Sequence, residues 1–132
     1  MTFPHQVVDF NERVLGISPR PMDMLNVVEH ELSVKCLNEE VQEFSDAHII
    51  GDYVGCVDAM IDLMYFAVGV MYKMGVTPDK MNLCMTAVHE SNMGKKLGVN
   101  YRRGDGKAAD AIKQADWVSP EERISEILDG ND

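Results

Sequence analysis

The sequence has too few cysteines, in the wrong arrangement, for a disulfide-bonded or zinc-binding scaffold. Its 132 residues include three: Cys36, Cys56 and Cys84. The number is odd and no C-x-x-C pair occurs, so neither a disulfide framework nor a structural zinc site is expected. Each cysteine lies in an apolar stretch, which predicts buried free thiols in a reducing compartment.

Positive charge and long apolar runs are also scarce. The chain has 12 Lys and Arg against 22 Asp and Glu, a net charge of −10. Such a surface repels phosphate backbones, so nucleic acid is not an expected partner. The longest uncharged apolar run, residues 63–72, is about half as long as a bilayer-spanning stretch. Residues 1–5 do not have the pattern of a secretion signal. We therefore expect a soluble cytoplasmic protein with no membrane partner.

Alternating strand patterns of useful length are absent, and helical periodicity takes their place. The spacing of apolar residues predicts four core helices, over about residues 4–16, 23–48, 53–74 and 77–97. The third is apolar nearly all round, which predicts a place at the centre of the core. Short helices are predicted over 108–114 and 119–128. The sequence thus predicts one all-α domain, a helical bundle over 1–97 with a C-terminal arm over 98–132.

A first acidic cluster lies within one turn of the second predicted helix. It comprises Glu39, Glu40 and Glu43. Like charges three or four residues apart destabilise a helix unless a cation is present. Taken alone, the cluster is better explained by a solvated acidic stripe.

A second acidic pair makes a cation site the better interpretation. Asp58 and Asp62 lie four residues apart in the most apolar stretch of the chain, where a carboxylate is costly unless paired or metal-bound. No Lys or Arg occurs between Lys35 and Lys73. A short turn at Gly51 would bring the two acidic groups face to face. The resulting site would be rich in carboxylate oxygens, which are the ligands that Mg²⁺ and Mn²⁺ prefer. The alternative to a cation site is a buried Asp that accepts a hydrogen bond from a nearby hydroxyl.

A third polar group lies near the end of the fourth predicted helix. His89, Asn92 and Lys96 fall roughly on one face, and Lys95 is three residues from Asn92. Amide and ammonium groups can hold phosphate oxygens beside a cation site. An ordinary polar helix end, with lysines favoured by the helix dipole, is the alternative.

These motifs resemble the E-x-x-E and E-x-x-D signature of MazG-like nucleoside triphosphate pyrophosphohydrolases. That superfamily includes phosphoribosyl-ATP pyrophosphohydrolases and dimeric dUTPases. Glu40, Glu43 and Asp62 match the signature, whereas Ala59 departs from it and Asp58 looks like the substitute. The chain is also similar to small phage and bacterial members, including MazZ-type enzymes that act on dGTP. That similarity covers most of the chain, through segments 9–11, 58–75, 88–95 and 105–107.

The resemblance implies hydrolysis of a (d)NTP, a purine such as dGTP being favoured, to (d)NMP and pyrophosphate. It implies two or three Mg²⁺ or Mn²⁺ ions per site, held by Glu40, Glu43, Asp58 and Asp62. Glu39 or Glu40 would take the proton of the attacking water. Phosphate contacts are expected from Asn92, Lys95, Lys96, Arg103 and Lys107. Base contacts are expected from Phe10 and Asn11, the latter standing where relatives have a His. The site would lie between subunits of a homodimer or homotetramer, in the host cytoplasm if the chain is phage-encoded.

Other functions stay open at this point. Phosphoribosyl-ATP, dUTP and dCTP are alternative substrates within the superfamily. From another class, a non-catalytic helical metal-binding or assembly module would have a similar bundle. A di-iron bundle would need E-x-x-H pairs beside the acidic clusters, and none occurs there. Pyrophosphate release with and without EDTA separates an enzyme from a module.

Overall fold

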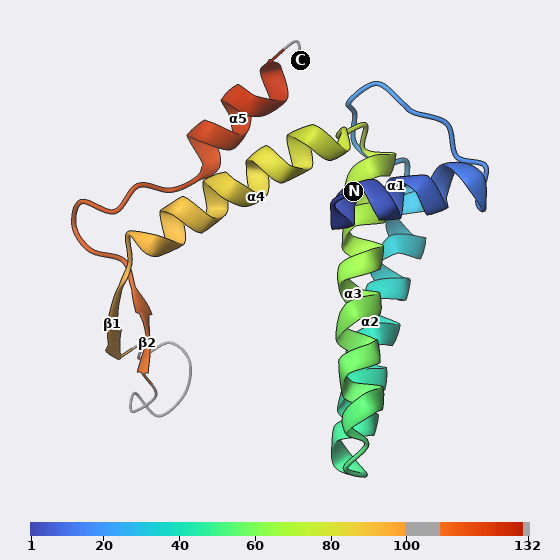
Figure 1. Cartoon of the computed structure of the whole chain (residues 1–132), viewed down its shortest axis with the longest axis horizontal. Helices are drawn as coiled ribbons and strands as arrows, with labels where there is room; N and C mark the ends of the chain where they lie inside the picture. Colours follow the sequence, from blue (N-terminus) through green and yellow to red (C-terminus); the bar gives the residue numbers. More distant parts are fainter. Residues whose placement is uncertain (100–108, 131–132) are drawn as a thin grey trace. The chain divides into compact units, whose positions relative to one another are not determined.

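A computed structural model describes residues 1–99 and 109–130 (Figure 1). These residues form five helices and one two-stranded sheet, which confirms the all-α class apart from that small sheet. The chain divides into two compact units, Met1–Pro78 and Asp79–Asp132. The boundary falls at the start of the fourth helix, which packs with the C-terminal residues.

The first unit is built on two long antiparallel helices, α2 (Val27–Ile49) and α3 (Tyr53–Lys73) (Figure 1). A third helix, α1 (Phe3–Arg13), packs against α3. Gly51, with a φ of 74°, forms the turn between α2 and α3. Asp52 then caps α3 by accepting a hydrogen bond from the Gly55 N–H at 2.9 Å. This tight turn sets the two acidic helices side by side.

The end of α3 depends on a glycine in a left-handed conformation. Gly75 has a φ of 87°, and its N–H donates to the Tyr72 carbonyl at 2.9 Å. A Cβ at this position would lie 2.5 Å from the carbonyl oxygen of Pro21. Glycine is therefore required both by the backbone angle and by the segment that packs on the end of α3.

The core of the first unit lies between α1 and α3. The ring of Tyr65 meets Phe3 and Phe10 edge to face, with centroid distances of 5.8 and 5.5 Å. The Tyr72 hydroxyl donates to the Ile17 carbonyl at 3.2 Å. The buried apolar residues of this core are Val7, Val8, Ala59, Val68 and Tyr72.

Burial in the single chain is lower than the sequence predicted. Val54, Val57 and Ile61 of α3 are 77%, 47% and 46% exposed, so the prediction that α3 is enclosed by the core is wrong for one chain. With three helices in the unit, one side of α3 has no layer to cover it. The three cysteines are free but only half-buried, so their predicted full burial is also wrong.

Helix α3 is long and apolar enough to cross a membrane by length and composition. It has 21 residues, with a mean hydropathy of 1.7 over its most apolar window. The central helix of a soluble bundle has the same properties. Asp58 and Asp62 lie within α3, where a lipid environment would make both carboxylates costly.

The second unit contains α4 (Pro78–Met93), β1 (Lys96–Val99), β2 (Ala109–Ile112) and α5 (Glu121–Asp129). The strands are antiparallel, with Lys96 opposite Ile112. The predicted extension of the fourth helix to residue 97 and the predicted helix over 108–114 are therefore wrong. Strands of four residues are too short to show alternation, and pairing with each other stabilises them.

Lys80 links α4 to the end of α5 by hydrogen bonds. Its Nζ donates to the carbonyl oxygens of Leu128 at 3.1 Å and Gly130 at 2.6 Å, and the residue is 8% exposed. Met81 and Ile127 are buried in the same unit. A cation at the carbonyl end of a helix satisfies groups that have no partner within the helix. Lys80 therefore holds the end of α5 in place.

Candidate functional site

The acidic residues of α2 and α3 form a cluster in the first unit. Glu40 is 8% exposed, and its Oε2 atom is buried without a hydrogen-bond partner. The charges of Glu43, Asp58 and Asp62 all act on this carboxyl group. Asp62 is half-buried, while Glu43 and Asp58 are exposed. The structure thus brings together the four carboxylates that the sequence singled out as ligands.

Among the residues that the structure describes, the cluster lacks a counter-charge. The pKa of Glu40 is raised to about 7, first by burial and then by hydrogen bonding with Glu43 and repulsion from Glu43, Asp62 and Asp58. The pKa of Asp62 is raised by burial and then by repulsion from Asp58 and Glu43. In the part of the chain that the structure describes, no Lys, Arg or His forms an ion pair with any of the four.

The cluster fits a hard divalent cation by its donor atoms. Carboxylate oxygens are the ligands that Mg²⁺ and Mn²⁺ prefer, and a cation would satisfy the buried Oε2 of Glu40. Across residues 1–99 and 109–130, no three His, Cys, Asp or Glu side chains are already arranged as an ion site. The side chains would therefore have to turn toward an ion as it binds.

Glu39 faces away from these four carboxylates. It is exposed and lines a separate depression of about 510 Å³ with Lys35, Asn38 and Gln42. Consecutive residues of an α-helix point about 100° apart, so Glu39 and Glu40 cannot share one face. Within a single chain, Glu39 does not join the cluster.

A cavity of about 210 Å³ lies along the same helices. Phe10, Tyr65 and Phe66 supply aromatic walls, and Asn11 and Ser33 supply polar groups. Phe66 is four residues from Asp62 along α3, a rise of about 6 Å. The cavity therefore begins about one helical turn from the acidic cluster.

Asn11 is the most enclosed polar side chain of this cavity. It is 4% exposed, and its Nδ2 donates to the Val7 carbonyl at 2.9 Å. That bond orients the amide, and no other described residue hydrogen-bonds to its Oδ1. Gly69 leaves room beside it, since a Cβ there would lie 3.5 Å from Nδ2. Both residues predicted to contact a base, Phe10 and Asn11, line this one cavity.

A comparison with protein families bears directly on this arrangement. The phosphoribosyl-ATP pyrophosphohydrolase family matches residues 11–92. The chain belongs to this family. It is accordingly a nucleotide pyrophosphohydrolase of the MazG-like all-α type, as the acidic motifs predicted. The match spans α2, α3 and all four clustered carboxylates. No curated protein matches the chain.

The residues predicted to bind phosphate belong to the second unit, where the family match ends. Asn92 is exposed in the last turn of α4, and Lys95 follows it, half-buried. Lys96 begins β1, so the prediction that it shares a helix face with Asn92 is wrong. Arg103 and Lys107 lie outside the described residues.

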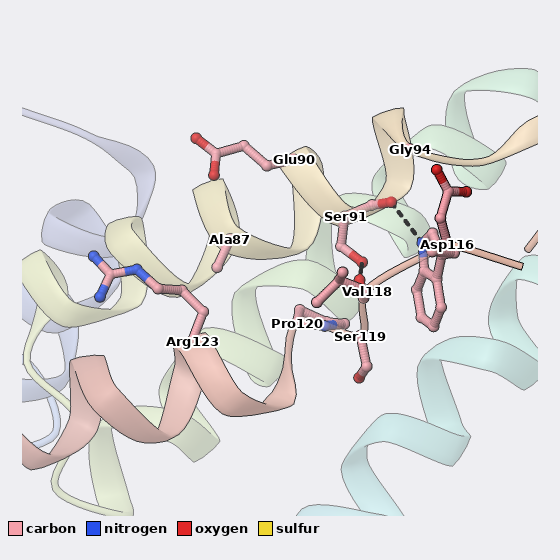
Figure 2. A pocket seen from close by; sticks show the side chains of 10 residues that line it. Ala87, Glu90, Ser91, Gly94, Asp116, Val118, Ser119, Pro120 and Arg123 are labelled. Carbon is pink, nitrogen blue, oxygen red and sulfur yellow. Dashed lines mark hydrogen bonds between the residues drawn. The ribbon is translucent and has the colours of Figure 1, made fainter. Parts of the chain in front are cut away.

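The sequence did not predict a cavity of about 380 Å³ in the second unit (Figure 2). Glu90 projects from α4 and Arg123 from α5 at its edge. The Ser91 hydroxyl donates to the Val118 carbonyl at 2.7 Å and closes one side. Trp117 also lines this cavity.

Proposed function

We propose that this pyrophosphohydrolase converts a purine nucleoside triphosphate, with dGTP the leading candidate, into a nucleoside monophosphate and pyrophosphate. The reaction would depend on Mg²⁺ or Mn²⁺. The observation that carries the proposal is the buried, unpartnered Oε2 of Glu40 among three other carboxylates. A triphosphate can approach such an acidic site only with cations that offset the mutual repulsion.

The proposed chemistry places the oxygen of one water molecule on the α-phosphorus. The bond between that phosphorus and the α–β bridging oxygen breaks, and pyrophosphate leaves with the bridging oxygen. Two or three divalent ions held by Glu40, Glu43, Asp58 and Asp62 would supply charge neutralisation when bound. Glu40 or Glu39 would take the proton from water.

The cavity beside Phe10 and Asn11 supports a nucleoside subsite next to the carboxylates. Its aromatic walls suit the flat face of a base. The Oδ1 of Asn11 can accept two hydrogen bonds through its two lone pairs. Guanine presents two adjacent N–H donors on one edge, which supports a guanine nucleotide. The preference for dGTP over GTP rests on the resemblance to the phage enzymes.

Basic and amide side chains are proposed to hold the phosphate tail. Ammonium, guanidinium and amide groups are the donors that phosphate oxygens prefer. We assign this role to Asn92, Lys95, Lys96, Arg103 and Lys107.

A second copy of the chain is the proposed partner, as a homodimer or homotetramer with the site between subunits. Val28, Leu32 and Val57 on α2 and α3 are 74%, 54% and 47% exposed. Apolar side chains left exposed along two adjacent helices are typical of an interface. Light scattering after gel filtration should give at least twice the mass of one chain, and a monomer would contradict the proposal.

The activity is tested with a panel of triphosphates in Mg²⁺ and in EDTA. We expect monophosphate and pyrophosphate as products only with the metal, and the highest kcat/KM for dGTP, with dATP and GTP next. A nucleoside diphosphate and orthophosphate would overturn the assigned bond. Preference for dUTP, dCTP or dTTP over every purine would overturn the base assignment. Phosphoribosyl-ATP belongs in the panel because it gives the family its name.

A further inference from the structure

Half of the positive charge of the chain lies in a short segment of an otherwise acidic protein. Residues 95–113 contain six of the 12 Lys and Arg, but only two of the 22 Asp and Glu. Lys95 and Lys113 flank the two strands of the hairpin within this segment. The register pairs Lys96 with Ile112, so one further step along the strands puts Lys95 beside Lys113.

Both ammonium groups rest on one aromatic ring. The Nζ of Lys113 lies 4.7 Å from the centroid of the Trp117 indole, and the Nζ of Lys95 lies 5.3 Å from it. The ring is held by its Nε1–H, which donates to the Ser91 carbonyl at 2.7 Å. Cation–π attraction stabilises each lysine in this position. The base of the hairpin therefore holds two positive charges against the Trp117 ring, whose position is fixed by a hydrogen bond.

Within residues 1–99 and 109–130, these two charges have no counter-charge of their own. No described carboxylate forms an ion pair with Lys95 or Lys113. Glu90 and Asp116 line the cavity that Trp117 also lines, where Arg123 is the basic group (Figure 2). Two positive charges that contact the same ring repel each other, and a bound anion would offset that repulsion.

We propose that Lys95, Lys113 and Trp117 form a site for a small phosphoryl anion such as pyrophosphate. Ammonium groups bind phosphate as compact point charges, and two of them match a multiply charged anion. A long polynucleotide would meet the acidic remainder of the surface, so a small anion fits the charge distribution better. Free pyrophosphate and the terminal phosphates of a nucleotide share this chemistry. Lys113 and Trp117 lie beyond the family-matched residues, and the site does not depend on the proposed substrate.

The full chain offers a direct reporter for this site, because Trp117 is its single tryptophan. Inorganic pyrophosphate, titrated in EDTA, should change the Trp117 fluorescence in a saturable way. Lys95→Gln and Lys113→Gln should each weaken binding about tenfold, as expected for loss of one charged contact. Lys113→Arg keeps the charge and should retain binding. Lys35→Gln, at an exposed position of α2, is the matched control and should leave binding unchanged.

Further measurements separate this site from the proposed catalytic cluster and from folding defects. Asp62→Ala should bind pyrophosphate as the wild type does, even without turnover. The helicity of each variant, measured by circular dichroism, should match the wild type. If a non-hydrolysable α,β-imido dGTP competes with pyrophosphate, the site binds the terminal phosphates of a nucleotide. If it does not compete, the site binds free pyrophosphate. No saturable response at millimolar pyrophosphate, equal weakening by Lys35→Gln, or tighter binding of a single-stranded oligonucleotide would overturn the proposal.

Discussion

Among the described residues, each unit of the molecule buries one charged side chain, and the two have opposite surroundings. Lys80 and Glu40 are both 8% exposed. Lys80 donates to two carbonyl oxygens at the end of α5. Glu40 has a buried oxygen without a partner and other carboxylates as neighbours. Buried charges are normally satisfied within the fold. Lys80 therefore stabilises its unit, whereas Glu40 costs stability and is better explained by what it binds.

Removing a neighbour of Glu40 should have the largest effect. Asp62→Ala or Glu43→Ala should lower turnover in Mg²⁺ by at least about 100-fold, because each removes a proposed ligand from the cluster. Helicity measured by circular dichroism should stay the same. Glu31→Ala changes an exposed carboxylate of the same helix α2 and should be neutral. Near-full activity in either cluster variant would show that the metal site is wrongly assigned.

Removing the satisfied charge should affect stability first. Lys80→Met keeps a similar length but loses both hydrogen bonds to the end of α5. We expect a loss of about 2 kcal/mol in the free energy of unfolding, measured by denaturant titration with Trp117 fluorescence. Lys35→Met, at an exposed site, should change it little. An unchanged midpoint in Lys80→Met would mean that burial of Lys80 does not stabilise the unit.

The pH dependence of stability should distinguish the two buried charges further. Folding raises the pKa of Glu40 from 4.5 to about 7, so the folded chain binds this proton more tightly than the unfolded chain. Stability without metal should therefore fall as the pH rises from about 4.5 through 7. In EDTA, Glu40→Gln should melt a few degrees above the wild type at pH 8, with a smaller difference at pH 5. The same difference at both pH values would contradict this assignment.

The smallest expected effect concerns the cavity beside the cluster. A Cβ at Gly69 would make ordinary contacts with Asn11, at 3.5 Å from Nδ2 and 3.8 Å from Oδ1. Glycine within a helix costs about 0.5–1 kcal/mol relative to alanine, so Gly69→Ala should raise the free energy of unfolding by about that amount. Gly55→Ala is the contrasting variant, because its Cβ would clash with the Asp52 carboxylate. Equal destabilisation by both substitutions would show that the space beside Asn11 is tighter than these distances indicate.

The elements that the sequence predicted best are those with signals close by in the chain. Helix α3 begins and ends within one residue of its predicted bounds, because Asp52 caps its start and Gly75 ends it. The hairpin was missed because Lys96–Val99 and Ala109–Ile112 have no local strand signal and depend on their pairing. Likewise, the sequence marked the acidic residues as a group but did not indicate that Trp117 contacts two lysines.

The sequence by itself determined the α2–α3 hairpin and the acidic residues it carries, since capping, turns and three- or four-residue spacing act within a few residues. Only the tertiary structure decided which carboxylate is buried. Glu39 and Glu40 are chemically identical neighbours, yet packing encloses Glu40 and leaves Glu39 exposed. The tertiary structure also decided that Lys95 and Lys113 both contact the Trp117 ring. Burial and contact between distant residues depend on how helices and strands pack, which local spacing does not specify.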